Sequence, residues 1–221
     1  MTKNEVLTEL QARSNPSTLA HNKKYGATNT FGVKLGDIRA LAKKIKVDPA
    51  LSLELWQTGN ADAQMLSCLI AKPSELTPDE LIRRAEMTDF AHVADWFNNY
   101  LLKDHPQRED IRKLGLKSDN KWGLRSAWSL TAGVIARGAS GLNLDEVLNE
   151  LEATMPKADP EVQWTMNTAL ANIGIYHLPW RQRAIDIGEK LGIYRDFPVS
   201  KGCTSPFAPI WINAMAKRQD G

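Results

Sequence analysis

Cysteine is scarce in this 221-residue chain, with only Cys68 and Cys203, which lie far apart in the sequence. A framework of disulfides is therefore not expected, and a reducing compartment such as the cytoplasm fits best. No apolar run approaches the roughly 18–20 residues that a membrane span needs. The polar start MTKNEVLTEL resembles neither a signal nor a transit peptide. We therefore expect a cytoplasmic protein without a membrane-spanning segment.

Residue patterns that mark several enzyme classes are also missing. The four histidines are scattered and lack the spacing of metal ligands, so no metal or other cofactor is expected. No glycine-rich loop follows a strand pattern, which argues against a phosphate loop and a dinucleotide fingerprint. Cys203, in KGCTSP, lacks a base that the sequence identifies, and a structural thiol is the simpler interpretation.

Helix chemistry is what the sequence has in abundance. Three segments open with Asp or Thr followed by Pro, namely DPALSLELW, TPDELIRRA and DPEVQWTMNTALANI. Such a pair caps a helix and places Pro at its first position, where no backbone N–H is needed. No alternating pattern long enough for a useful strand is present. The sequence therefore predicts an all-α fold.

Four segments between residues 51 and 173 each consist of a short helix, a polar connector and a second helix, which is the arrangement of a helical repeat. When the second helices are superimposed, Gln64, Asp95, Arg125 and Trp164 become equivalent, at steps of 31, 30 and 39 residues. We predict a single domain over 1–221, a curved α-solenoid of antiparallel helix pairs of the HEAT or ARM type. Basic cap helices would occupy 1–46, the repeats 47–177, and a C-terminal cap with a tail that packs back 178–221.

The formal net charge of +2 conceals an uneven distribution. Residues 1–46 carry nine Lys and Arg against three acidic residues, a net +6, whereas 178–221 carry a net +3 and the middle a net −7. A basic end of this kind is typical of polyanion binders, although a solvated helix face would explain it equally well. The candidate DNA-binding residues here are Lys23, Lys24 and Lys34, with Lys43 and Lys44 as further candidates.

The equivalent positions are polar where a buried seam would prefer Leu or Ala. Because the second helices of a curved stack line its concave face, we expect Gln64, Asp95, Arg125 and Trp164 to form one row along a groove. Trp128 lies on the same helix face, three residues after Arg125, and is a further candidate contact. The core would explain two or three of the Trp residues that open these helices, and the others suit contacts with nucleic-acid sugars and bases.

Three stretches stand out for their order and spacing: TFGVKLGDIRALAKKI, TDFAHVADWF and SDNKWGLRSAW. Together they resemble the DNA alkylation repair proteins of the HEAT-like, alkylpurine DNA glycosylase type. The first is similar to the family's N-terminal segment, the second to the segment with its catalytic Asp, and the third to its Asp-Asn-x-Trp-x-x-Arg motif. The resemblance covers roughly residues 15–175.

The resemblance implies roles for two residues. Asp95 corresponds to the family's catalytic carboxylate, and Arg125 to the Arg that holds the DNA backbone. Similar enzymes remove positively charged N3- or N7-alkylated purines without fully flipping the base into a pocket. Since an alkylated purine is already a cationic leaving group, a carboxylate near the anomeric carbon can stabilise the oxocarbenium-like sugar and orient a water.

Two positions depart from the family pattern. Ala91 and Thr168 stand where the characterised glycosylases have the Trp residues that flank the sugar of the lesion. With a one-residue shift, Phe90 could replace the first of these Trp residues, and Trp164 lies one turn from the second. The family also contains members that bind DNA structures with weak or no excision activity.

Three functional interpretations result. The leading one is a monomeric DNA alkylation repair protein that grips double-stranded DNA in a basic concave groove and hydrolyses the N-glycosidic bond of cationic alkylpurines. The alternatives are a non-catalytic relative that binds DNA structures, and a helical scaffold whose groove binds a protein. Salt dependence of binding separates the scaffold from the first two, because phosphate contacts release counterions.

Overall fold

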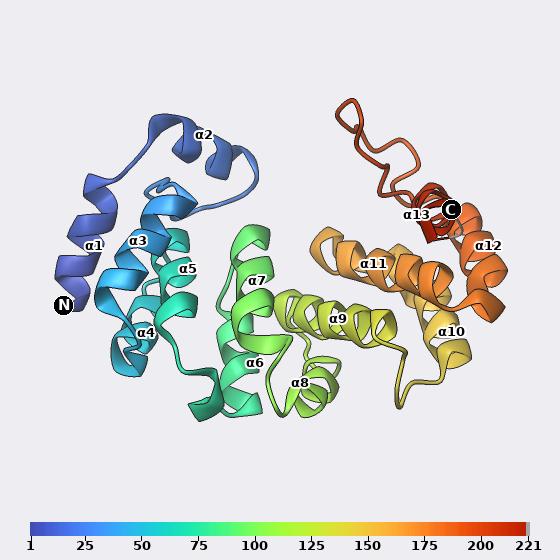
Figure 1. Cartoon of the computed structure of the whole chain (residues 1–221), viewed down its shortest axis with the longest axis horizontal. Helices are drawn as coiled ribbons and strands as arrows, with labels where there is room; N and C mark the ends of the chain where they lie inside the picture. The colour runs from blue at the N-terminus through green and yellow to red at the C-terminus, as the bar shows by residue number, and fades with distance from the viewer. Residues whose placement is uncertain (220–221) are drawn as a thin grey trace. The chain divides into compact units, whose positions relative to one another are not determined.

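The computed structural model describes residues 1–219, which form helices joined by short connections (Figure 1). The thirteen α-helices of this described part confirm the predicted all-α fold. Among these residues, β-type pairing is limited to one isolated bridge, between Ser14 and Val33. Packing divides the chain into two compact units, Met1–Ser126 and Ala127–Gly221. The single domain expected over 1–221 stays a prediction.

The first unit contains eight complete helices and the start of a ninth. They are α1 (Lys3–Ala12), α2 (Pro16–Lys24), α3 (Leu35–Ile45), α4 (Pro49–Trp56), α5 (Ala61–Ile70), α6 (Pro78–Glu86), α7 (Ala91–Phe97), α8 (Arg108–Gly115) and α9 (Lys121–Ala136). A 3-10 turn, η1 (Pro73–Glu75), precedes α6, and a π-helical turn, η2 (Asn98–Leu102), continues α7. Helix α5 packs between α3 and α7, while α4 packs on α5 and α6 on α8, as expected for stacked helix pairs (Figure 1).

The second unit continues with α10 (Leu144–Thr154), α11 (Pro160–Tyr176), α12 (Arg181–Leu191) and α13 (Ala208–Gln219), together with the 3-10 turns η3 (Met155–Lys157) and η4 (Leu178–Trp180). Helix α11 packs on both α12 and α13. The segment before α13 is held by Asn167, whose side-chain amide donates to the carbonyl of Pro206 at 2.9 Å. Phe207 and Ile212 are buried, which confirms that this part of the tail packs back on the last helices.

The predicted helix starts are confirmed, and capping bonds explain two of the three. The Asp48 carboxylate accepts from the backbone N–H of Leu51 at the start of α4. Thr77 forms a reciprocal capping box with Glu80 at the start of α6. Helix α11 begins at Pro160 as predicted, although Asp159 makes no capping bond there. Side-chain caps satisfy N–H groups that have no partner within the helix.

The cysteines and the helix lengths agree with the composition. Cys68 and Cys203 are both free. Cys68 is buried, and burial raises the pKa of its thiol well above the usual range, as expected for an unreactive structural thiol. Within residues 1–219, no helix combines the length and apolar character needed to cross a bilayer.

Candidate nucleic-acid interface

Asp95 on α7 and Arg125 on α9 form an ion pair within the first unit. The Nη2 atom of Arg125 donates to Oδ1 of Asp95 at 2.5 Å. The Arg125 side chain is only 4% exposed, whereas the Asp95 side chain is 54% exposed. Arg125 therefore approaches the carboxylate from the protein interior, and the remainder of the carboxylate faces solvent. A charge-assisted hydrogen bond of this kind fixes the orientation of the carboxylate.

The SDNKWGLR stretch aims Arg125 by forming the start of α9. The side-chain oxygen of Asn120 accepts from the backbone N–H of Trp122 at 2.8 Å. The Ser118 hydroxyl donates to Glu86 on α6 at 2.6 Å, which ties this helix start to the preceding repeat. A side chain at Gly123 would place its Cβ 2.5 Å from that hydroxyl, so glycine is needed for the close approach. The stretch thus fixes the helix end from which Arg125 projects one turn later.

A stripe of aromatic side chains runs along α7 and η2, beside Asp95. Its members are His92, Trp96 and Tyr100. The ring of His92 meets the edge of Trp96 at 6.2 Å between centroids, and Trp96 meets Tyr100 at 4.9 Å. Burial lowers the pKa of His92 below its ordinary value, although the negative charge of Asp95 acts in the opposite direction. His92 is therefore neutral near pH 7, and it adds no positive charge beside the Asp95 carboxylate.

A buried carboxylate, Asp62 on α5, anchors the segment that precedes α3. It accepts from the backbone N–H groups of Phe31 at 2.6 Å, Gly32 at 3.1 Å and Val33 at 2.9 Å, and from the Thr30 hydroxyl at 2.8 Å. Gly32 has a φ of 75°, and a Cβ there would lie 2.5 Å from the backbone of Leu19. Four donors satisfy the buried charge, and they fix the TFGVK segment to the second helix of a repeat.

The three candidate DNA-binding lysines are all exposed on the first unit. Lys23 and Lys24 lie in the last turn of α2, and Lys34 occupies the N-cap position of α3 without a capping bond. No ion pair of these three side chains is found among the described residues. The hydroxyl of Thr28 donates to Asp89, which joins the loop after α2 to the segment just before α7. This contact keeps the basic segment beside the helix that carries Asp95.

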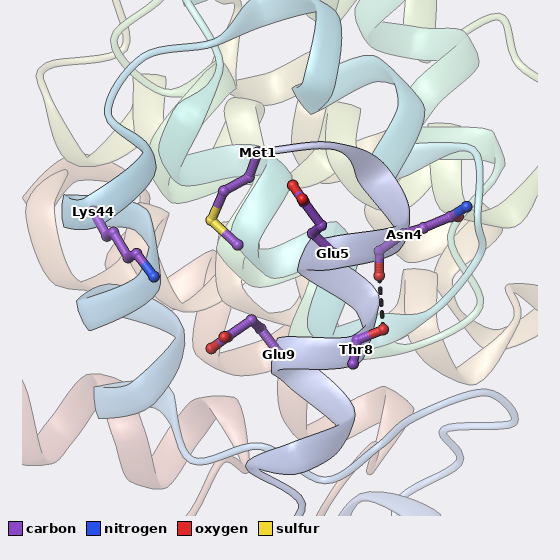
Figure 2. Close-up of a pocket in the computed structure, with 6 residues that line it drawn as sticks. All are labelled: Met1, Asn4, Glu5, Thr8, Glu9 and Lys44. Carbon is purple, nitrogen blue, oxygen red and sulfur yellow. Dashed lines mark hydrogen bonds between the residues drawn. The ribbon is translucent and has the colours of Figure 1, made fainter.

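Lys44, by contrast, faces the acidic side of α1. Figure 2 shows it extending from α3 towards a pocket that Glu5 and Glu9 line from α1. The pKa of Glu5 is lowered chiefly by hydrogen bonds with Thr2, that of Glu9 chiefly by its bond with Arg13, and Lys44 lowers both further. Since two carboxylates offset its charge, Lys44 is a poorer candidate phosphate contact than the sequence suggested.

The comparison with known families decides the ancestry. A family model described as DNA alkylation repair enzyme matches residues 6–193. The chain belongs to this family. A solved structure described as "A new family of proteins related to the HEAT-like repeat DNA glycosylases with affinity for branched DNA structures" has a TM-score of 0.79 and 23% sequence identity, covering 99% of this chain and 95% of that chain. That likeness shows the HEAT-like fold. No curated protein was found to match the sequence.

Within this family frame, three of the sequence-based expectations are wrong. Gln64 is fully buried and its amide donates to the carbonyl of Trp56 at 3.4 Å, so it does not line a solvent-facing groove. Trp128 is buried in the second unit and serves the core. Phe90 is also buried, and therefore cannot replace the family Trp whose position Ala91 occupies. In each case the side chain fills the space between packed helices, which a helical spacing alone does not reveal.

The remaining expectations are met in part. Asp95 and Arg125 do lie together, but Arg125 is turned inward to the carboxylate and away from solvent. Trp164 is 38% exposed, and its ring contacts Tyr194 at 5.4 Å and Phe197 at 5.9 Å within the second unit. A continuous row from Asp95 to Trp164 stays a prediction, as do the DNA contacts of the lysines.

Two functional details were not foreseen from the sequence. The anchoring role of Asp62 could have been suspected, because it is the single charged residue of a largely apolar helix, α5. The position of His92 beside Asp95 could also have been suspected, because residues three apart on a helix are neighbours on its surface. Among the described residues, no cluster of three or more His, Cys, Asp or Glu side chains could hold a metal ion.

Proposed function

We propose that this chain binds DNA through its basic first unit and hydrolyses the N-glycosidic bond of cationic N3- or N7-alkylpurines, with Asp95 as the catalytic carboxylate. The observation that carries the proposal is the solvent-facing carboxylate of Asp95, held from behind by buried Arg125. An exposed carboxylate repels the phosphates of a polyanion. Its presence beside a basic segment makes chemical sense where positive charge develops on the ligand, as it does at C1′ when a cationic purine departs.

In the proposed reaction, the bond between C1′ and the purine nitrogen breaks and its electron pair leaves with the base. The departing alkylpurine becomes neutral, so no general acid is needed. Asp95 stabilises the positive charge that develops on the sugar and accepts a hydrogen bond from the attacking water. The water oxygen then bonds to C1′, and its proton is released to solvent. The products are a free alkylpurine and an abasic site.

Arg125 receives a different role from the one that the family resemblance implied. Because its guanidinium is buried against Asp95, we assign it the orientation of the catalytic carboxylate, as a positioning residue. The phosphate contacts then fall to the exposed lysines, namely Lys23, Lys24 and Lys34. A neutral His92 leaves the negative charge of Asp95 facing the substrate without a competing cation on its own helix.

The decisive experiment is single-turnover release of N7-methylguanine from duplex DNA. We expect Asp95→Asn to slow release by about 10²–10³, the usual effect of losing one stabilising charge at a transition state. Binding to DNA should be unchanged or slightly tighter, because a group that repels phosphate has been removed. Asp104→Asn is the matched control, since Asp104 is also an exposed carboxylate of the first unit.

A thermal melt of the same variants completes the test. The ion pair with Arg125 means that Asp95→Asn lowers the melting temperature under any assignment, so only the rate distinguishes catalysis from structure. A normal rate of base release in Asp95→Asn, measured below its melting temperature, would show that Asp95 is not the catalytic carboxylate.

A second candidate function is non-catalytic binding of branched DNA. Ala91, at the position of a family Trp, favours it, because no aromatic side chain is then available there to flank a lesion's sugar. The solved structure with the same fold belongs to proteins described as having affinity for branched DNA. Tighter binding to a four-way junction than to a duplex, together with no base release, supports this function. Affinity for both DNAs that does not change with salt favours a protein-binding scaffold instead.

A further inference from the structure

A shallow pocket on the first unit lies apart from the Asp95–Arg125 pair, beyond Trp96. Its volume is about 430 Å³, within the range of roughly 300–1,000 Å³ typical of small-molecule sites. We call it the Tyr100 pocket, and it is lined by Arg39, Ala42, Lys43, Lys46, Val47, Leu69 and Tyr100. The proposed reaction assigns no role to it.

One side of the Tyr100 pocket is strongly basic. Its cations are spaced four and three residues apart, which places them along one face of α3. They are Arg39 and Lys43 within the helix and Lys46 at its C-cap. All three are exposed, and no ion pair of theirs is found within residues 1–219. The guanidinium of Arg39 lies over the ring of Trp96, with 4.7 Å between the guanidinium carbon and the ring centroid. No acidic side chain is among the residues that line this pocket, whereas Lys44 on the neighbouring face shares its pocket with Glu5 and Glu9.

The other side is apolar and aromatic. Tyr100 is 41% exposed, and Val47 is 62% exposed. Tyr100 belongs to the π-helical turn η2, an element that occurs frequently at functional sites. Its ring contacts the ring of buried Trp96, with 4.9 Å between the centroids and 40° between the planes. An exposed ring beside these cations suits a ligand that has both a flat ring and a negative charge.

We propose that the Tyr100 pocket binds one unpaired nucleotide of a DNA strand, with the base stacked on Tyr100 and the backbone phosphates at Arg39, Lys43 and Lys46. Stacking on aromatic side chains combined with a basic track is the usual way in which proteins hold single strands. The three cations extend about 10 Å along α3, at 1.5 Å per residue. That length suits consecutive phosphates of a strand better than the single phosphate of a free nucleotide.

The inference rests on the proposed DNA binding and specifies it. In a duplex, the faces of the bases are stacked on each other and cannot reach a side chain. The pocket would therefore engage DNA only where a strand is unpaired, as at a fork or flap. The pocket would give the chain a preference for forked or flapped DNA over a plain duplex, and this preference does not depend on catalysis at Asp95.

Fluorescence of 2-aminopurine tests the stacking directly. The base is placed in the unpaired arm of a forked DNA and, separately, within a duplex of equal length. Wild-type protein should quench the arm and leave the duplex unchanged. Tyr100→Ala should abolish the quenching and weaken binding to the fork about tenfold, the effect expected from losing one stacked base. Tyr100→Phe should behave as wild type, and Tyr176→Ala, which removes another exposed Tyr, is the control.

Charge is tested with the double substitution Lys43→Gln/Lys46→Gln. For a single-stranded arm, losing two phosphate contacts should reduce the slope of log affinity against log salt by about 1.4, at roughly 0.7 per contact. Lys3→Gln/Lys72→Gln removes the same charge from exposed positions outside the pocket and should change the slope less.

The outcomes separate this inference from the proposed function. If wild-type protein binds the fork but Tyr100→Ala and Tyr176→Ala behave alike, the pocket assignment is overturned and DNA binding stands. If the wild type binds neither DNA, the proposed function fails with it. Loss of quenching on addition of millimolar deoxynucleoside monophosphate, but not of a single-stranded oligonucleotide, overturns the assignment to a strand and makes a free nucleotide the ligand.

Discussion

The substitution Arg125→Gln separates two roles for this guanidinium. Glutamine keeps a hydrogen-bond donor and part of the apolar stem but removes the charge. If Arg125 orients Asp95, the substitution weakens one charge-assisted hydrogen bond, a contact whose net contribution is about 1.5–3 kcal/mol. Because Asp95 is half-exposed, solvent screens the pair, and we expect a loss of stability of about 1 kcal/mol.

Two measurements follow from that magnitude. For a chain of this size, a loss of about 1 kcal/mol lowers the melting temperature by about 2–4 °C. The slope of log affinity against log salt for duplex DNA should stay the same, because a buried guanidinium releases no counterion. Base release should slow, since the carboxylate loses its orientation. Lys157→Gln, which removes an exposed charge from the second unit, serves as the control for net charge.

The opposite pattern would refute the reasoning. A salt slope reduced by about 0.9, with an unchanged melting temperature, corresponds to the loss of one phosphate contact on duplex DNA. It would mean that Arg125 leaves Asp95 on binding and takes the backbone role that the family resemblance implied.

Three further substitutions probe other parts of the molecule. Replacing Lys23, Lys24 and Lys34 together with Gln should reduce the salt slope for duplex DNA by about 2–3, at roughly 0.9 per contact; an unchanged slope in anisotropy titrations would remove them from the interface. Asp62→Asn should lower stability by about 3 kcal/mol, because three backbone N–H groups and a hydroxyl lose their ionised acceptor; chemical denaturation measures it, and a loss below about 1 kcal/mol would contradict the anchoring role. Trp164→Ala should weaken DNA binding about five- to tenfold if its exposed ring stacks on a base, and equal affinity would leave it as a support for Tyr194 and Phe197.

The helix starts were predictable because their chemistry is local. A capping Asp or Thr with Pro behind it identifies a helix entrance whatever the helix later packs against, and α4, α6 and α11 begin as the sequence indicated. The pairing of Asp95 with Arg125 was also within reach, because a repeat of about 30 residues places equivalent side chains on neighbouring helices. What the repeat could not supply was the direction in which each side chain turns.

Burial explains the failures at Gln64 and Trp128. Helix α5 is enclosed by α3, α4 and α7, so nearly every side chain on it is buried. The polar side chain of Gln64 therefore forms an internal hydrogen bond and does not face solvent. The Tyr100 pocket was missed for another reason. The spacing of Arg39, Lys43 and Lys46 was visible in the sequence, but the π-helical turn that brings Tyr100 opposite them has no local signature.

The anchoring of the TFGVK segment by Asp62 limits how the protein can be shortened. Removing the first 33 residues to isolate the repeats would strip a buried carboxylate of its four donors at once. An ionised group left in that environment is costly enough to unfold α5 and the helices packed on it. A shortened form that begins after Val33 should therefore be insoluble, and a protease should cut α1 and α2 away only after the first unit has opened. The basic segment is thus as much a part of the core of the first unit as the repeats that follow it.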